Sequence, residues 1–169
     1  MWIFGYGSLL SANGLKNRGI TFEYDESDFV EARLQGYRRM WNAVWNHNRF
    51  LGLVKDDTST VNGVIFPLFP DDFETFKRSE GFDVDPPTYF LVDIKEKISY
   101  PESFRINPDD RILTCVTIKR NLEGSIPLSY IKELKDSLKI RGAKFAEEFI
   151  ETTYPQNVFK EALLWNSSS

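Results

Sequence analysis

The chain has one histidine and one cysteine among its 169 residues, and this scarcity excludes several kinds of active site. A zinc site built on several histidines is impossible, and any Cys/His or Ser/His pair would have to use His47. His47 lies in the polar run at residues 45–49, which is typical of a loop between strands, so we interpret it as a surface residue. Cys115 lies in the apolar run Ile112–Val116, which predicts a buried, inert thiol. A catalytic proton carrier would therefore be a carboxylate, a tyrosine or a lysine.

The chain also lacks an excess of positive charge and a long apolar run. Lysine and arginine number 21 against 25 acidic residues, which gives a formal net charge of −4. Nucleic-acid binding needs a dominant basic surface, so we expect no nucleic-acid partner. No apolar run is long enough to span a bilayer, and no basic segment precedes an apolar one near the N-terminus. We therefore expect no membrane association and a cytoplasmic location.

The hydrophobic pattern is typical of strands over the first two thirds of the chain. The predicted strands span residues 2–6, 30–42, 51–54, 64–68, 88–98 and 111–118. Asn62-Gly63 predicts a hairpin turn into the fourth of them. Short helices are predicted at residues 15–19 and 73–79, the second after Pro70 and two acidic residues.

The pattern changes to helical spacing after Pro127. Its apolar positions are Ile131, Leu134, Leu138, Phe145, Phe149 and Tyr154. An interruption at Arg141-Gly142 predicts two helices or one broken helix, and Pro155 ends the pattern. We expect these residues to pack against the sheet. The length favours a single domain over residues 1–155, followed by a C-terminal extension with a frayed tail over residues 156–169.

A glycine-rich motif follows the first predicted strand, in the order Gly5-Tyr6-Gly7-Ser8. Glycines there permit a positive φ and leave peptide N–H groups uncovered, and the serine hydroxyl can donate or accept beside them. This favours a cradle for an anion or a carboxylate. The motif is not a known phosphate loop, because it contains neither GxxxxGK[ST] nor GxGxxG and has no lysine or arginine close by. A purely structural turn is the alternative interpretation.

Glu80 is the second candidate, because it ends the predicted helix at residues 73–79 and directly precedes Gly81. A carboxylate held there partly among aromatic side chains such as Phe76 is suited to accept and return a proton. A solvated helix end is the alternative interpretation.

Taken in order, these and other segments resemble the γ-glutamylcyclotransferase family, from Trp2 to about Tyr154. The resemblance is carried by FGYGSLL at residues 4–10, GYR at 36–38, NGVIFPL at 62–68, Glu80-Gly81, the strand led by Tyr89 and the helix ending near Tyr154. It implies a small α+β fold, in which a mixed sheet curls toward a barrel with helices packed outside. It also implies one pocket between the N-terminal loop and the acid.

The chemistry that the resemblance implies is cyclisation of a small γ-glutamyl peptide or γ-glutamyl amine. The substrate's α-amine attacks its own γ-carbonyl, which releases 5-oxoproline and an amine or amino acid and needs no metal or cofactor. By this analogy Glu80 is the catalytic residue, which takes the proton from the attacking amine and delivers it to the departing nitrogen. The γ-glutamyl head would be held by Phe4, Gly5, Tyr6, Gly7, Ser8 and Leu9, with Tyr89 as a lesser candidate.

The chain departs from the family pattern at two places. Phe82 stands where members often have a tyrosine, and Thr117-Ile118 stands where many have a second tyrosine. The resemblance therefore does not define the pocket for the leaving group. A non-catalytic module that binds a small amine or carboxylate is therefore an alternative. Nucleic-acid binding through residues 33–49 is a third, although we interpret that segment as a strand with a buried aromatic face and a solvated basic face.

Overall fold

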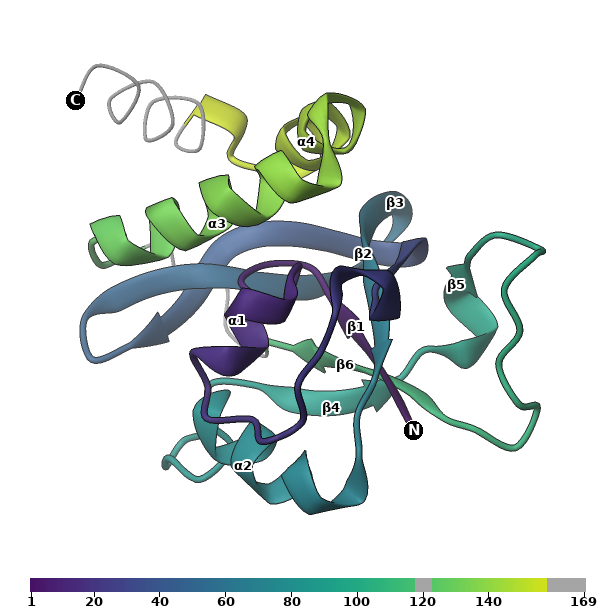
Figure 1. Cartoon of the computed structure of the whole chain (residues 1–169). Helices are drawn as coiled ribbons and strands as arrows, with labels where there is room; N and C mark the ends of the chain where they lie inside the picture. The colour runs from purple at the N-terminus through teal and green to yellow at the C-terminus, as the bar shows by residue number, and fades with distance from the viewer. Residues whose placement is uncertain (118–122, 158–169) are drawn as a thin grey trace.

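The computed structural model describes residues 1–117 and 123–157, and within them a single seven-stranded sheet forms the centre of the molecule. Six strands follow the order β4-β6-β1-β3-β2-β5, and β7 pairs with β2. The strands are β1 (Trp2–Gly5), β2 (Val30–Trp45), β3 (Asn48–Pro67), β4 (Phe90–Asp93), β5 (Ile98–Ser99), β6 (Ile112–Val116) and β7 (Thr153–Tyr154). The sheet is mixed, because β1 runs parallel to β6 and antiparallel to β3. The long strands β2 and β3 curve strongly, which curls the sheet (Figure 1).

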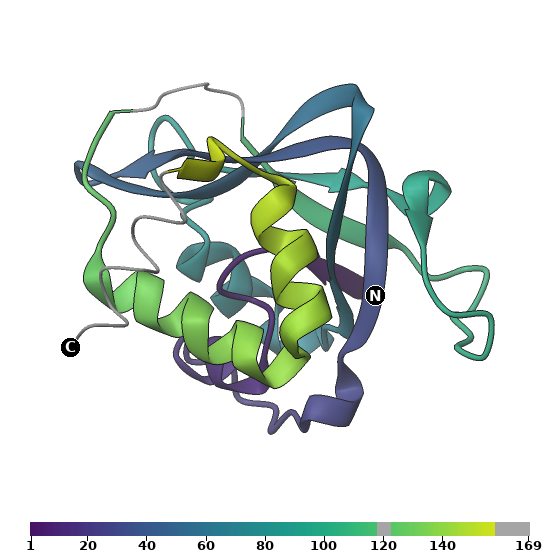
Figure 2. The ribbon, with the colours of Figure 1, turned by 90° about the horizontal axis from the view of Figure 1, so that it is seen from above.

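The α-helices lie outside this sheet. They are α1 (Ala12–Lys16), α2 (Phe73–Ser79), α3 (Leu128–Arg141) and α4 (Ala143–Glu151), with short 3₁₀ turns at Glu26–Asp28, Pro70–Asp72 and Lys95–Lys97. Helices α3 and α4 lie over β2 and β3, and α2 lies on the opposite side of the molecule (Figures 1 and 2). Gly142 separates α3 from α4 with φ +93°, at the interruption that the sequence predicts. None of the helices within the described residues is long and apolar enough to cross a membrane.

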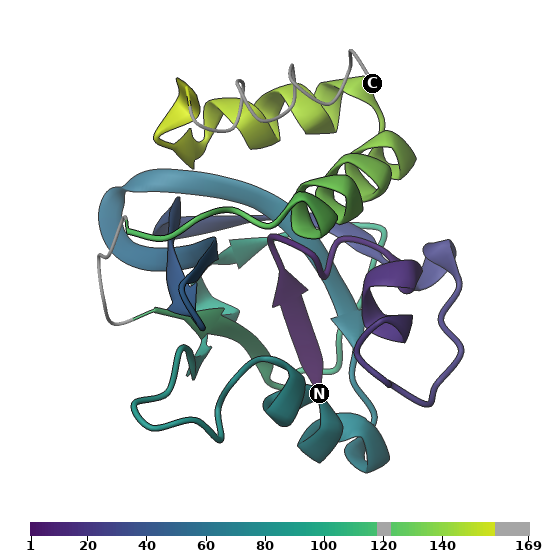
Figure 3. The ribbon, with the colours of Figure 1, turned by 90° about the vertical axis from the view of Figure 1, so that its left-hand side faces the viewer.

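The core lies between the concave side of the sheet and the helices that cover it. Ile3 and Phe4 of β1 are fully buried, as are Leu134 of α3 and Phe149 of α4. Burying side chains of this size contributes about 1.5–3 kcal/mol each. Figure 3 shows β1 pointing toward α3, so the loop that follows β1 lies beneath this helix.

The hairpin turn lies where the sequence predicts a loop at residues 45–49, and the one predicted at Asn62-Gly63 is absent. Asn46 and His47, with φ 48° and 60°, form the connection, so His47 does lie in an exposed loop between strands. Asn62 and Gly63 lie inside β3 and form no hairpin turn. A Cβ at Gly63 would lie 2.5 Å from the carbonyl oxygen of Gly5, so the close approach of β1 requires the glycine.

The C-terminal pattern ends earlier than predicted. Helix α4 ends at Glu151, and Tyr154 belongs to β7 with 48% of its surface exposed, so it is no part of the core. Of the predicted strand at 111–118, residues Ile112–Val116 form β6, and Ile118 lies outside the described residues. The greater part of the predicted extension, residues 158–169, also lies outside them.

The basic aromatic segment forms β2, as expected, but its charges are not all solvated. Tyr37 and Trp41 are buried, and so is Arg39, completely. Arg39 donates to the backbone oxygen of Phe149 at 3.0 Å and to the Asn62 side-chain oxygen at 3.1 Å, and its guanidinium lies 3.6 Å from the Phe149 ring centre. Arg39 therefore holds α4 against β2 and β3.

Candidate active site

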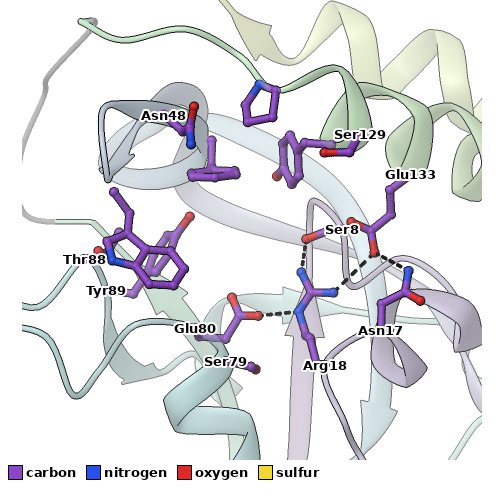
Figure 4. Close-up of a pocket in the computed structure, with 14 residues that line it drawn as sticks. Ser8, Asn17, Arg18, Asn48, Ser79, Glu80, Thr88, Tyr89, Ser129 and Glu133 are labelled. Atoms are coloured by element: carbon purple, nitrogen blue, oxygen red, sulfur yellow. Dashed lines mark hydrogen bonds and ion pairs between the residues drawn. The ribbon is translucent and has the colours of Figure 1, made fainter.

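A cavity of about 480 Å³ opens beside the loop that follows β1, between the C-terminal end of α2 and the N-terminal turn of α3 (Figure 4). Ser8, Glu80 and Tyr89 all line it. A smaller chamber adjoins it, shares these three residues and is also lined by Tyr6, Gly7 and Leu9. The fold therefore brings together most of the candidate residues. Phe4 and Gly5 lie behind them in β1 and line neither space.

The loop after β1 owes its shape to close packing. Contrary to expectation, neither Gly5 nor Gly7 has a positive φ. A Cβ at Gly5 would lie 2.6 Å from the Leu9 carbonyl oxygen, and one at Gly7 would lie 2.9 Å from Tyr130 Oη. Within the described residues, the backbone N–H groups of Gly7, Ser8 and Leu9 donate no hydrogen bond to the protein. These three N–H groups therefore remain available to a ligand as hydrogen-bond donors, and close packing, not a positive φ, requires the two glycines.

Three tyrosines form neutral walls around the inner chamber. Tyr6 donates to the Cys115 carbonyl oxygen and Tyr89 to the Leu51 carbonyl oxygen, both at 2.7 Å. The Tyr130 hydroxyl accepts a hydrogen bond from the Leu51 N–H at 3.4 Å. Burial raises the pKa of all three phenols, so they stay protonated. Tyr130 was not a candidate from the sequence.

Glu80 caps the C-terminal end of α2, where its own N–H donates to the Phe76 carbonyl oxygen at 3.1 Å. Gly81 then reverses the chain with φ +72°. The Glu80 side chain is 11% exposed, and its Oε1 accepts a hydrogen bond from Arg18 Nε at 2.6 Å. Its second oxygen has no donor among the described residues and points away from Arg18 (Figure 4). The acid is therefore held by a guanidinium, which the sequence does not predict.

Arg18 is a charged residue of this site that sequence reasoning missed. It follows α1, is 15% exposed, and donates to the Gly14 carbonyl oxygen at 2.5 Å and to the Ser8 hydroxyl oxygen. It also lies 3.4 Å from Glu133 of α3. Burial opposes its charge, but the two carboxylates outweigh burial and raise the pKa of Arg18 above its ordinary value. The sequence places no cation beside the glycine loop, yet the fold supplies one.

The site offers no evident place for a metal ion. Across residues 1–117 and 123–157, no group of three or more His, Cys, Asp or Glu side chains is arranged to hold one. The side chains that face one another here are suited instead to hydrogen bonding and proton transfer.

Comparison with known proteins places this geometry in a known fold. No protein-family model matches the chain. Among solved structures, a γ-glutamyl cyclotransferase superposes with a TM-score of 0.63 at 16% identity, over 95% of this chain and 85% of that one. YkqA from Bacillus subtilis gives a TM-score of 0.65 at 19% identity, over 83% of this chain. An uncharacterized human protein gives 0.61 at 16% identity, over 95% of this chain and 85% of that one.

These similarities establish the fold. The protein has the α+β architecture of γ-glutamylcyclotransferase-like proteins, with a curled mixed sheet and helices outside, so the expected fold class is confirmed. The chain spans 48% of YkqA, about half the length of that protein.

Proposed function

We propose that the protein is a γ-glutamylcyclotransferase-type enzyme, which releases 5-oxoproline and an amine or amino acid from a γ-glutamyl peptide or γ-glutamyl amine. One observation carries the proposal. Ser8 of the glycine loop and Glu80 of α2 line the same cavity of about 480 Å³ and both bind Arg18, in a fold shared with a γ-glutamyl cyclotransferase.

In this proposal the loop holds the γ-glutamyl head. The uncommitted N–H groups of Gly7, Ser8 and Leu9 are donors suited to the oxygen atoms of the head. The loop is held close to Tyr130 of α3 at Gly7. Donors that are already oriented stabilise negative charge that develops on the γ-oxygen at little reorganisation cost. The hydroxyl hydrogens of Tyr6 and Tyr89 are already donated to backbone oxygens, so these two walls do not compete for this charge.

Glu80 moves protons during ring closure. The α-ammonium loses two protons as its nitrogen bonds to the γ-carbon, and the departing nitrogen gains two as its bond to that carbon breaks. Glu80 carries these two protons one after the other, taking each from the attacking nitrogen and delivering it to the departing nitrogen. No water is consumed, because the substrate's own amine is the nucleophile. Because the attacking amine and the carbonyl belong to one molecule, positioning alone supplies a large part of the rate.

Incubation with a panel of γ-glutamyl compounds tests the proposal. The panel contains glutathione, other γ-glutamyl amino acids and γ-glutamyl amines, with 5-oxoproline measured by mass. We expect 5-oxoproline and the free amine in equal amounts from at least one compound, and at least about 10²-fold slower release of both from the Glu80→Gln variant. Saturable binding of a γ-glutamyl compound without any product would contradict the proposed enzymatic function and support the non-catalytic binding module.

A further inference from the structure

Arg18 connects all the parts that meet at the cavity, and the reaction proposed above gives it no role. Its guanidinium contacts Gly14 of α1, Ser8 of the loop, Glu80 of α2 and Glu133 of α3. These contacts engage all three of its nitrogens, and its side chain is only 15% exposed. An arginine committed on every side is poorly placed to bind a further carboxylate and well placed to orient the groups around it.

Arg18 occupies one hydrogen-bonding position on Glu80 and one on Ser8, and leaves another position free on each. Arg18 Nε occupies Oε1 of Glu80, so the second carboxylate oxygen remains free to accept a proton. Arg18 Nη2 donates to the Ser8 hydroxyl oxygen, so the hydroxyl hydrogen remains free to be donated. Within the described residues, that hydrogen has no acceptor in the protein.

We propose, on the basis of the proposed function, that Arg18 is the positioning residue of this site. It fixes Glu80 with one oxygen free as the proton acceptor, and it fixes Ser8 as a hydrogen-bond donor to the γ-glutamyl head.

Charge gives a second reason for this role. Arg18 lies between the carboxylates of Glu80 and Glu133, at 2.6 Å and 3.4 Å. Without the guanidinium, two carboxylates would share a largely buried space with no cation between them. Like charges in such surroundings repel strongly, so Glu80 would turn away from its working position.

Substitution of Arg18 tests the proposal. In Arg18→Lys a compact ammonium replaces the planar fork and cannot orient both Glu80 and Ser8. We expect kcat to fall by about 10²-fold in Arg18→Lys and in Arg18→Ala, the loss typical of slight misplacement, while KM changes by only about threefold. Millimolar guanidinium should restore at least about tenfold of the lost kcat in Arg18→Ala, because the ion can occupy the vacated position.

Arg33→Gln is the matched control, because Arg33 forms an ion pair with Glu148 at 2.7 Å on the outer surface of β2 and lines no part of the cavity. It should keep wild-type kcat and show no response to guanidinium. The inference fails if Arg18→Lys keeps kcat within threefold of wild type, or if KM rises while kcat is kept, since Arg18 would then only bind substrate. It also fails if Arg18→Lys is impaired and guanidinium does not rescue Arg18→Ala. Absence of 5-oxoproline from the wild-type protein would instead overturn the proposed function itself.

Discussion

Glu80 is held at one carboxylate oxygen and free at the other, which makes Glu80→Gln a sharp test of its role. The amide oxygen of glutamine can still accept the hydrogen bond from Arg18, so the fold should be retained. The other amide atom is an NH₂ group and cannot take a proton, so we expect turnover to fall by about 10²–10⁴-fold. Initial rates of 5-oxoproline release and thermal melting curves check this. Activity within a few-fold of wild type would remove Glu80 as the proton carrier.

Gly7 offers a test of the loop. A Cβ there would lie 2.9 Å from Tyr130 Oη, so in Gly7→Ala the loop or the tyrosine must shift. We expect kcat/KM to fall by at least about tenfold, with a loss of stability of about 1 kcal/mol, at the lower end of the cost of overpacking. Gly7→Val should be worse because its side chain is larger and β-branched.

The Gly7→Ala/Tyr130→Phe double variant is the control, since it removes the hydroxyl oxygen that the new methyl group meets. If crowding is the cause, the alanine should cost much less activity in the Tyr130→Phe background than in the wild-type one. An equal cost in both backgrounds would show that the loop backbone, and not this contact, is disturbed.

The start of α2 depends on one buried acid, Asp72, which joins it to the segment after α1. Its carboxylate accepts hydrogen bonds from the Thr21 N–H at 2.8 Å, the Thr21 hydroxyl at 2.7 Å and the Phe22 N–H at 3.1 Å. Burial alone would raise the pKa of Asp72, but these donors outweigh it and lower the pKa below its ordinary value. Since α2 carries Glu80 at its end, this anchor also helps to position the site.

Asp72→Asn should therefore destabilise the protein in a way that depends on pH. A lowered pKa in the folded state means that the contribution is present above the unfolded-state pKa, about 3.9, and is lost as pH falls through the folded-state pKa. We expect the variant to lose about 2 kcal/mol at pH 7 and to approach the wild type below pH 4. Urea unfolding at pH 7, 5 and 3 measures the difference. A difference that stays constant across this range would contradict the role given to the charge.

Local sequence signals predict most of the elements, and long-range contacts explain the errors. Apolar periodicity correctly indicates β1, α2 and the pair of helices separated at Gly142. Asn62-Gly63 looks like a hairpin turn because Asn-Gly favours one locally, but Gly63 is required by the close approach of β1. Tyr154 continues the helical spacing only by coincidence, since α4 has already ended at Glu151.

In the candidate site, too, local patterns could be predicted and long-range contacts could not. The glycine loop and Glu80 could be found because each is a short local pattern whose order resembles a known family, and the structure places Ser8 and Glu80 around one cavity. Their roles remain predictions. Arg18, Tyr130 and Glu133 could not be found, because no local pattern marks their contacts. Arg18 meets Glu80 and Glu133, and Tyr130 meets Gly7, only in the folded chain.

At the scale of the whole molecule, the candidate site is a partly enclosed space between distant segments. The cavity lies where the end of β1, the end of α2 and the start of α3 meet, so distant segments must all be in place before it exists (Figure 4). In the proposed function, this space would hold a γ-glutamyl chain bent for ring closure, with its α-amine near its own γ-carbonyl. A hydrolase acting on the same amide would instead have to bring water to that carbon.

The substrate's free α-amine separates these two mechanisms. If the amine is the nucleophile, N-acetylation of the γ-glutamyl compound should abolish the reaction completely, because the acetylated nitrogen no longer attacks. A water nucleophile would leave cleavage of the same amide possible, and its product would be free or acetylated glutamate in place of 5-oxoproline. Mass analysis of matched free and acetylated substrates distinguishes the outcomes, and a chelator in parallel samples should leave the rate unchanged. Release of glutamate, or loss of activity with the chelator, would refute cyclisation by Glu80 while leaving the fold as described.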